Sequence, residues 1–391
     1  TTEIYTLSLH DALPIFVGLC TLLLGLGGML PVHGTPPEST EVMSITPIVL
    51  QVNEDGFGDS LNGQTPSLEV FNGSLVAGTW HNGEPNAQIW RWDGGTSWTK
   101  VHDQYAHGTA DMAVFGDYLY AGSWGNDGQI WRSDDLVEWE TIINDGFDNP
   151  NNGIARFEVF QDELYVSTWN GTDGTEIWHT ADGVEWYQST DADVFDNPNN
   201  AGAIASEIYN GYLYWGVGNW IDGAELWRTT GIDEEWEVIF DGGNGDPINH
   251  AVASLTEYKG YLYASIFNEN EIQVWRSSNG QTDWEIVLQG GMLNPETKWI
   301  SGLAVYHTHL YLVVQNDTNG LEVWRTLNGT DWEMVGSPGF GDPNNGTTYW
   351  ESSILVYEDA LLFGTNNYVT GGEVWQIIQP LHILNLPVVV R

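Results

Sequence analysis

Short runs of apolar or alternating residues, separated by turns, recur along most of the chain, and tryptophan marks them. An aliphatic residue followed by Trp occurs in each of seven units, at Trp90, Trp131, Trp178, Trp227, Trp275, Trp324 and Trp375. Successive tryptophans are 41, 47, 49, 48, 49 and 51 residues apart. A repeat of about 40–50 residues is typical of propeller blades. The pattern therefore predicts seven similar structural units.

Each unit divides into four strand-like pieces, called a to d here. In the third unit the pieces are residues 155–160, 163–169, 175–180 and 184–189. Each piece alternates or is apolar throughout, as expected for strands buried between sheets. Asn or Asp precedes Gly183, Gly280 and Gly329 between pieces c and d, which favours a tight hairpin. We therefore predict an all-β fold, a seven-bladed β-propeller of four-stranded antiparallel blades.

The two ends of the repeat region complement each other. The last unit ends after piece c, at Ile378, and has no piece d. The segment Thr46 to Asp59 is similar to Trp236 to Asp246, which is a piece d with its following loop. We expect Pro47 to Val52 to complete the seventh blade, so that the N-terminal strand closes the ring and removes an open sheet edge.

Three short segments precede the expected propeller. Residues 1–15, TTEIYTLSLHDALPI, resemble the translation of a common sequencing adapter fused in frame. Residues 16–34 have the apolar run and small residues of a secretory signal peptide whose basic start is missing. Residues 35–45 are a polar linker, the propeller is expected over 46–379, and 380–391 form a C-terminal tail. The chain is therefore expected to be secreted, outside the cell or in its envelope, with no membrane span in the mature part.

Composition limits the partners of the protein. The chain has 54 acidic and only 10 basic residues, for a formal net charge of −44. Such a surface repels phosphate backbones and anionic membranes and attracts cations, so we expect no nucleic-acid partner. The only cysteine, Cys20, lies in the expected signal peptide, which excludes disulfides from the mature chain. With 41% hydrophobic residues and 21 Trp the chain has enough apolar surface for a core, and we expect a monomer.

The recurring Trp of piece c is interpreted as a structural anchor, because burying an indole removes a large apolar surface from water. Where Arg follows it, a Glu follows the Trp of piece d. The four expected pairs are Arg132 with Glu140, Arg228 with Glu237, Arg276 with Glu285, and Arg325 with Glu333. In the third unit both positions change together, to His179 and Tyr187.

The turn between pieces c and d resembles the Asp-box, or BNR repeat, Ser/Thr-x-Asp-x-Gly-x-x-Trp, of sialidase-like propellers. Matching stretches run from Ser133 to Trp139, Thr180 to Trp186, Ser277 to Trp284 and Thr326 to Trp332, most of them one residue short and two with Asn for Asp. The resemblance covers about residues 45–378 at the level of the fold, and in that family the box is a structural turn. A sialidase would also need three arginines around the substrate carboxylate. Five of the seven arginines occupy the piece c slot and Arg391 is terminal, which leaves Arg156 alone, so we exclude sialidase chemistry.

One face of the expected propeller carries the b–c and d–a loops. The b–c loops open with Trp80, Trp124, Trp169, Trp220 and Phe267, and the d–a loops are rich in Asn and Asp. Flat aromatic faces beside amides and carboxylates suit sugar rings, which offer C–H faces and hydroxyls. The alternative is that these aromatics cap the blades and pack on Pro and Gly of adjacent loops.

Residues that break the repeat point to a candidate site at the channel mouth. The predicted ligand-binding residues beyond the four tryptophans are His107, Arg156, His250, Lys298, Trp299, Tyr349, Trp350 and Glu351. Asp111 and Arg156 lie four residues before the last aromatic of piece a and should face the channel. If the protein is an enzyme, an acid/base pair would come from Glu351, His250, Glu158 and Asp111.

Two loops are rich enough in oxygen ligands to suggest calcium. They contain Asp145, Asp148, Asp191, Asp193 and Asp196. The EF-hand spacing is absent, and the alternative is solvated turns capped by Asx side chains. No other cofactor is indicated.

Three functions follow from these observations. The first is non-catalytic binding of an extracellular glycan or protein through the loop face rich in Trp, Asn and Asp. The second is a glycoside hydrolase or polysaccharide lyase with its site at the channel mouth. The third is a structural protein of the cell envelope without a small ligand.

Overall fold

The computed structural model describes residues 46–380 except 84, 126, 190–194, 196, 232–234, 269, 291–296 and 349–350, and it does not describe the side chains of Lys298 and Glu351. Regular structure within this part consists of β-strands and four short 3-10 turns, so the all-β prediction is confirmed. The 3-10 turns are η1 (Asp55–Gly58), η2 (Gly242–Gly245), η3 (Pro338–Gly341) and η4 (Glu351–Ser353). Among the described residues we find no helix with the length and apolar character to cross a bilayer.

Consecutive strands pair into antiparallel meanders of four, as the four pieces of each unit predict. The first three are β2 (Asn62–Phe71), β3 (Ser74–His81), β4 (Ala87–Gly94) and β5 (Ser97–Gln104); β6 (Gly108–Phe115), β7 (Tyr118–Trp124), β8 (Ile130–Ser133) and β9 (Glu140–Ile143); and β10 (Gly153–Phe160), β11 (Glu163–Trp169), β12 (Ile177–Thr180) and β13 (Tyr187–Gln188). The next three are β14 (Asn200–Tyr209), β15 (Tyr212–Asn219), β16 (Glu225–Thr229) and β17 (Glu237–Phe240); β18 (Asn249–Tyr258), β19 (Tyr261–Asn268), β20 (Ile272–Ser277) and β21 (Glu285–Gln289); and β22 (Thr297–Tyr306), β23 (His309–Asn316), β24 (Gly320–Thr326) and β25 (Trp332–Val335).

The last group joins both ends of the repeat region. It contains β26 (Gly346–Thr347), β27 (Ile354–Tyr357), β28 (Ala360–Asn366) and β29 (Val374–Ile378). Strand β1 (Ile48–Gln51) pairs antiparallel with β29, with Ile48 opposite Ile378 and Gln51 opposite Trp375. The predicted pairing of the N-terminal segment with the last unit is therefore confirmed.

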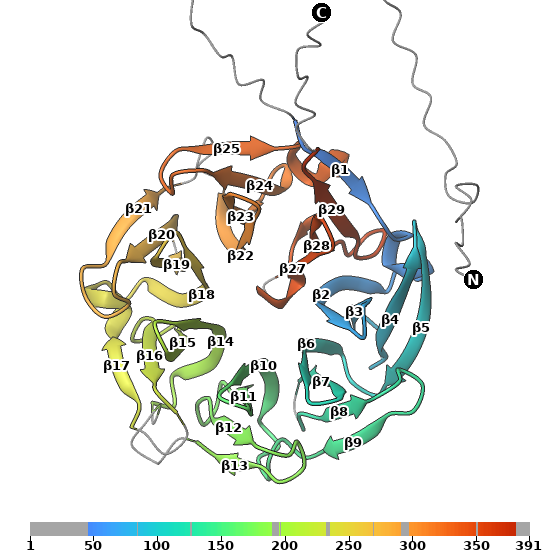
Figure 1. Ribbon diagram of the computed structural model, residues 1–391, viewed down its shortest axis with the longest axis horizontal. Helices are drawn as coiled ribbons and strands as arrows, with labels where there is room; N and C mark the ends of the chain where they lie inside the picture. Colours follow the sequence, from blue (N-terminus) through green and yellow to red (C-terminus); the bar gives the residue numbers. More distant parts are fainter. Residues whose placement is uncertain are drawn as a thin grey trace, which may run out of the picture. The chain divides into compact units, whose positions relative to one another are not determined.

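Figure 1 shows the groups following one another around a common axis, with the first strand of each group innermost and the last outermost. Backbone pairing divides the strands into sheets of thirteen, twelve and four strands. Neighbouring groups within a sheet meet at single residue pairs near one face, such as Trp80 opposite Gly108 and Trp169 opposite Gly202. The innermost strands thus carry the side chains that face the axis.

The piece c tryptophans are structural, as predicted. Trp131, Trp275 and Trp324 are each 4% exposed. In six of the seven units the indole N–H donates to a Gln or Glu two residues earlier, as Trp227 does to Glu225 at 2.7 Å. The preceding d–a loop covers the ring, and Phe147 stacks on Trp178 with 4.5 Å between centroids.

The expected ion pairs between pieces c and d are present. Nitrogen–oxygen distances are 2.9 Å for Arg132–Glu140, 2.7 Å for Arg228–Glu237, and 2.6 Å for both Arg276–Glu285 and Arg325–Glu333. In the third unit His179 instead lies 3.0 Å from Glu163, with its ring against Tyr187. Each pair ties the two outer strands of a blade together.

The turns that resemble the Asp-box have one hydrogen-bond pattern. In each turn one Oδ1 accepts two backbone N–H groups, as Asp182 does from Val184 and Glu185 at 2.8 and 2.9 Å. The same pattern occurs at Asp135, Asn279 and Asn328. Because both Asp and Asn offer this oxygen, the replacement of Asp by Asn preserves the turn.

Candidate ligand-binding site

An aromatic cavity of about 310 Å³ lies on the face that carries the b–c loops. We call it the aromatic mouth. Its lining residues are Gln64, Trp80, Trp124, Trp169, Ile204, Trp220, Ala251, Ala253, Phe267, Trp299 and Ile300. Five predicted ligand-binding residues, all of them tryptophans, therefore line one cavity. Gln64 is its one polar side chain among the described residues.

The rings of the aromatic mouth form a chain of contacts from one blade to the next. Centroid distances are 6.0 Å for Trp80–Trp124, 5.0 Å for Trp124–Trp169 and 5.5 Å for Trp169–Trp220. Phe267 and Trp299 stack face to face, with 4.0 Å between centroids and 8° between planes. The rings thus line the cavity as a run of four indoles and a stacked pair.

Glycines bring several of these rings close to the backbone. A Cβ at Gly108 would overlap Trp80, and one at Gly202 would overlap Trp169. The predicted alternative, in which the aromatics pack on glycines of adjacent loops, therefore describes one face of these rings. The same tryptophans also line the cavity, so packing and ligand contact are compatible.

Strand register explains why the aromatic residue of the mouth occupies a different position in the fourth and sixth units. Trp80, Trp124, Trp169 and Phe267 stand opposite Gln64, Gly108, Gly153 and Ala251. In the fourth unit Gly218 occupies that position, and a Cβ there would overlap the ring of Trp220, two residues later. In the sixth unit the aromatic lies on the other strand, with Trp299 opposite Gln315.

The remaining predicted mouth residues have different surroundings. His107 is exposed, with its ring 6.4 Å from that of Trp80, and His250 lies 5.9 Å from Phe267. Tyr349 and Trp350 lie outside the described residues, as do the side chains of Lys298 and Glu351. The prediction for these four positions stays a prediction.

Many of the loop asparagines expected around the mouth are buried and form hydrogen bonds that hold neighbouring loops together. Asn200 is fully buried, and it donates to Glu225 at 2.8 Å while accepting from Asn219 at 2.9 Å. Equivalent pairs of buried amides join Asn170 to Asn152, Asn268 to Asn249 and Asn367 to Asn345. These asparagines tie d–a loops to b–c loops and are not available to a ligand, which corrects the interpretation of the loops as an amide-lined surface.

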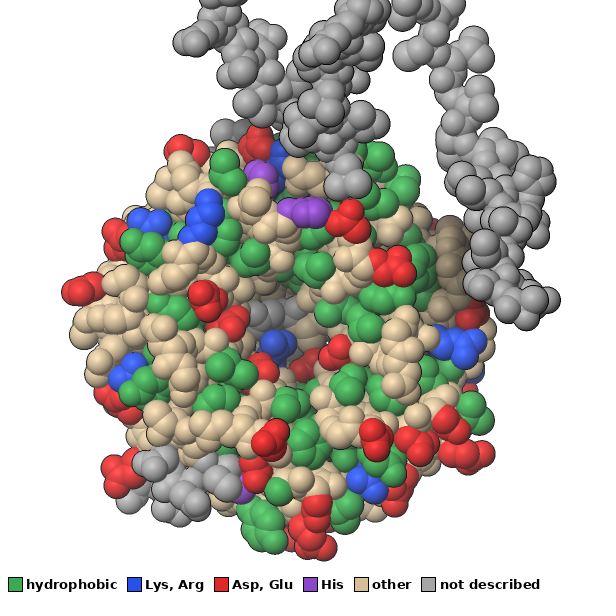
Figure 2. Space-filling view, in the orientation of Figure 1, with side chains coloured by type: hydrophobic (Ala, Val, Ile, Leu, Met, Phe, Trp, Pro, Cys, Tyr) green, Lys and Arg blue, Asp and Glu red, His purple; other side chains and the backbone are tan. Residues whose placement is uncertain are grey.

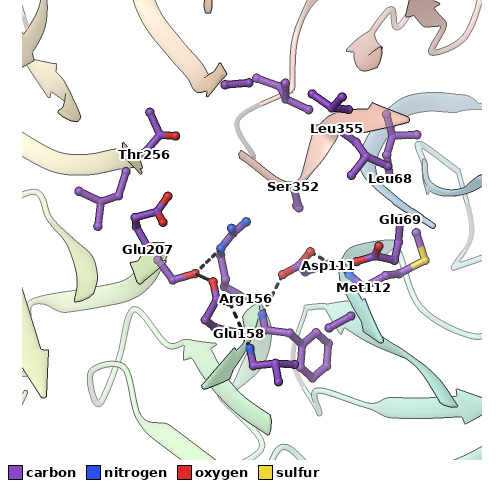
Figure 3. Close-up of a pocket in the computed structure, with 18 of the residues that line it drawn as sticks. Leu68, Glu69, Asp111, Met112, Arg156, Glu158, Glu207, Thr256, Ser352 and Leu355 are labelled. Atoms are coloured by element: carbon purple, nitrogen blue, oxygen red, sulfur yellow. Dashed lines mark hydrogen bonds between the residues drawn. The ribbon is translucent and has the colours of Figure 1, made fainter. Parts of the chain in front are cut away.

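A second cavity of about 570 Å³ surrounds the axis further along the inner strands. We call it the channel cavity. The two cavities adjoin along the inner strands, because Ile204 lines the mouth and Ser206 the channel cavity only two residues, about 7 Å, further along β14. Figure 3 shows Glu69, Asp111, Arg156, Glu158 and Glu207 directed toward a common space. Figure 2 shows the centre of one face hollowed, with acidic side chains spread over that face.

Arg156 is held by its neighbours within the channel cavity. Its Nε donates to Ser206 Oγ at 2.8 Å, and Ser206 in turn donates to Glu158 at 2.8 Å. Asp111 is 4% exposed and accepts the backbone N–H groups of Met112 and Phe157 at 2.8 and 2.7 Å. Both predicted channel residues therefore face the axis.

Burial changes the acidity of two carboxyl groups in this cavity. It raises the pKa of Glu69 to about 7, although the N–H of Val70 favours the ionised form. It also raises the pKa of Asp111 to about 6, against the opposing charge of Arg156 and two backbone N–H groups. The repulsion between these two carboxylates and Glu158 acts in the same direction.

Glu69 and Glu207 also line the channel cavity and are absent from the predicted residues, although a simple signal marks them. The position two residues before the last aromatic of each innermost strand lines the channel cavity in all seven units. The residues there are Glu69, Ala113, Glu158, Glu207, Thr256, Ala304 and Leu355. Strand alternation requires this result once the position four residues before the same aromatic faces the axis.

The cavities separate residues that the enzyme hypothesis combines. Asp111 and Glu158 line the channel cavity, whereas His250 lies against Phe267 at the mouth. Among the described arginines, Arg156 alone lines the channel cavity, so the described part offers no arginine triad.

Within the described residues no three His, Cys, Asp or Glu side chains are grouped to hold a metal ion. Asp145 and Asp148 lie within the described part, while Asp191, Asp193 and Asp196 lie outside it, so calcium stays a prediction.

We expect Glu69→Gln to stabilise the protein at pH 8 by about 1–3 kcal/mol. The pKa of Glu69 is about 7 in the folded state against an ordinary 4.5, so the folded protein holds the proton more tightly. In the wild type, the protonated Glu69 therefore stabilises the folded state. This contribution is complete below about pH 4.5 and is lost as the pH rises through about 7. Urea unfolding between pH 5 and pH 8 should show a flatter pH dependence for the variant. Glu138→Gln on an exposed turn is the control, and equal slopes for wild type and Glu69→Gln would contradict the burial of this carboxyl group.

No protein-family model matches the chain, and no curated protein matches it in sequence. Solved structures similar to it include a GH74 enzyme from Niastella koreensis, with a TM-score of 0.54, 14% identity, and coverage of 82% of this chain and 54% of that chain. The GH74 xyloglucanase from Xanthomonas campestris gives a TM-score of 0.50 at 15% identity, covering 82% of this chain and 59% of that one. The WD40 repeats of RRP9 give a TM-score of 0.50 at 12% identity, and the match covers 84% of this chain and 97% of that chain.

These similarities show a β-propeller fold. The chain spans little more than half the length of the GH74 structures it resembles. The sequence resemblance to the Asp-box family stays a prediction at the level of the family.

Proposed function

We propose that this chain is a secreted, monomeric, seven-bladed β-propeller that binds an extracellular glycan through the aromatic mouth without cleaving it. The observation that carries the proposal is the 310 Å³ cavity lined by five Trp and one Phe from successive blades. Clefts of this size with an aromatic lining are typical of small-molecule sites. The pyranose ring offers the flat C–H faces that such rings bind.

The blade count rests on the seven-fold repeat and on the pairing of β1 with β29. Under this proposal the N-terminal strand is the outermost strand of the last blade. Secretion rests on the resemblance of residues 16–34 to a signal peptide.

A glycoside hydrolase is the second candidate, because two GH74 proteins are among the structural neighbours and several carboxyl groups line the channel cavity. Hydrolysis needs an acid and a second carboxylate on either side of one glycosidic bond. Glu69 lies five residues, about 16 Å, along β2 from Gln64 of the aromatic mouth, whereas Glu207 lies three residues, about 10 Å, along β14 from Ile204. We place binding without cleavage first because none of the described residues that line the aromatic mouth carries a carboxyl group.

We expect Trp220→Ala and Trp299→Ala to weaken binding of oligosaccharides at least about tenfold, because each removes one stacking surface. Trp220 is 39% exposed, so thermal unfolding of that variant should change little. Isothermal titration with a panel of plant, fungal and bacterial oligosaccharides measures the affinity.

The neighbouring Ile221, which is 70% exposed, provides the matched control Ile221→Ala. Affinity should be unchanged in this control. Release of shortened products in the same mixtures would favour the hydrolase. If no oligosaccharide of the panel binds, the proposal is overturned, and a protein partner or a structural role remains. Equal loss of affinity in Ile221→Ala would place the contact outside the cavity.

A further inference from the structure

We infer that the glycan bound at the aromatic mouth carries free amino groups and is recognised as an ammonium-bearing sugar. This inference rests on the proposed function and names the class of sugar. Three independent features of the described residues support it: the π surface of the mouth, one buried acceptor in its wall, and the charge around the axis.

The aromatic mouth offers π faces and little else. Its rings include five indoles, the best cation–π partners among the side chains. The lining supplies a single polar side chain for the hydroxyl groups that neutral and aminated sugars both carry, so hydrogen bonding to hydroxyls does not separate the two classes. An ammonium group gains from each nearby π face, so an aminated sugar uses this lining more fully than a neutral one.

That polar side chain, Gln64, is 5% exposed and lines the wall of the cavity. Its Nε2 donates to the hydroxyl of Tyr368 at 2.5 Å, whereas its Oε1 has no partner among the described residues. A buried carbonyl oxygen without a donor is unfavourable, and a turn of the Gln64 amide toward the adjacent cavity would let a donor of the ligand satisfy it. An ammonium or amine N–H is such a donor.

The charge of the surroundings favours a cation. Most described Arg and Lys side chains are paired with an acid, namely Arg91, Lys100, Arg132, Arg228, Arg276 and Arg325. Lys259 donates to the carbonyl oxygen of Leu327, and Arg156 to Ser206. Beyond the mouth the same axis carries four carboxyl groups, Glu69, Asp111, Glu158 and Glu207, against Arg156, the one cation among the described lining residues, and the raised pKa values of about 7 and about 6 leave Glu69 and Asp111 partly protonated at pH 6. Their field attracts a cationic ligand toward the opening.

The test compares three oligosaccharides of equal length on the full chain: β-1,4-linked glucosamine, its N-acetylated form, and the neutral glucose form. At about pH 6 the amines are largely protonated, and titration should show about tenfold tighter binding of the glucosamine oligomer. This preference should shrink when salt rises from about 50 mM to about 500 mM. Equal binding of all three would overturn the inference and leave the proposed function standing. Binding of none of the three would overturn the inference alone if another oligosaccharide of the panel binds, and would overturn both if no oligosaccharide of the panel binds.

Two substitutions of one residue test the role of Gln64. Gln64→Glu keeps an acceptor and adds a negative charge, so it should strengthen binding of the glucosamine oligomer severalfold and leave the neutral oligomer unchanged. Gln64→Leu should remove the preference for the aminated form. If Gln64→Leu fails to fold, Gln64→Glu still decides, because a purely structural Gln64 would change the affinities for both oligomers equally.

Discussion

Removal of residues 46–52 is expected to abolish cooperative thermal unfolding of the propeller above room temperature. The deletion removes β1 and its pairing with β29, and it takes away Val52, which is 3% exposed. Val52 also donates its N–H to Val374 and accepts the indole N–H of Trp98 at 2.7 Å. Backbone hydrogen bonds and apolar burial lost together correspond to about 5 kcal/mol or more, comparable with the whole stability of many domains.

The same deletion leaves β29 as an unpaired edge. Apolar residues of β29 include Val374 and Ile377, which are fully buried beneath the sheet. An exposed strand edge of this kind favours association between chains, so the deleted protein should elute as aggregates. Scanning calorimetry and size-exclusion chromatography measure both effects.

The control for this deletion keeps the backbone and changes only side chains. Ile48 and Leu50 are 47% and 45% exposed, so the double substitution to Thr should shift the melting temperature by only a few degrees. A peptide spanning residues 46–53, added in trans, should restore part of the lost stability. A deleted chain that melts like the wild type would refute the closure of the last blade by β1.

The pairing of β1 with the last unit could be predicted because it depends only on where the repeat begins and ends along the chain. A unit that lacks its last strand and an N-terminal segment that resembles one leave a single consistent assignment. The ion pairs such as Arg228–Glu237 were predictable for the same reason, since strand register places the two positions opposite each other in every unit.

The loop amides could not be interpreted correctly from the sequence. Asn and Asp in turns are ordinarily solvated, and nothing local distinguishes the buried Asn200 from the neighbouring Asn199. Burial of Asn200 depends on Asn219 in the b–c loop and on Glu225, both of which come close only in the folded blade. Such a contact is set by tertiary structure.

The channel carboxyl groups illustrate a different limit. Alignment on the last aromatic of the innermost strand identified Asp111 and Arg156 correctly as axis-facing residues. The same alternation includes Glu69 and Glu207, which differ from the residues of other units only in side-chain type. The raised pKa of Glu69 depends on how deeply the cavity buries its carboxyl group, which no sequence period gives.

Asn200→Ala is expected to destabilise the protein by about 3–5 kcal/mol, which is a large effect for a single substitution. The substitution removes a donor to Glu225 and an acceptor for Asn219, both of them buried. Burial already raises the pKa of Glu225, while hydrogen bonds from Trp227 and Asn200 favour its ionised form. Loss of the Asn200 bond should raise that pKa further, so the destabilisation should be larger at pH 8 than at pH 5.

Asn199→Ala is the matched control, because Asn199 donates to Asp222 at 2.8 Å in an exposed contact. Its cost should be below about 1 kcal/mol, since exposed polar contacts contribute little. Urea unfolding of both variants at the two pH values separates a buried network from a surface turn. Equal costs for Asn199→Ala and Asn200→Ala would show that the loop amides are solvated, and the asparagines of the mouth would again become candidates for ligand contact.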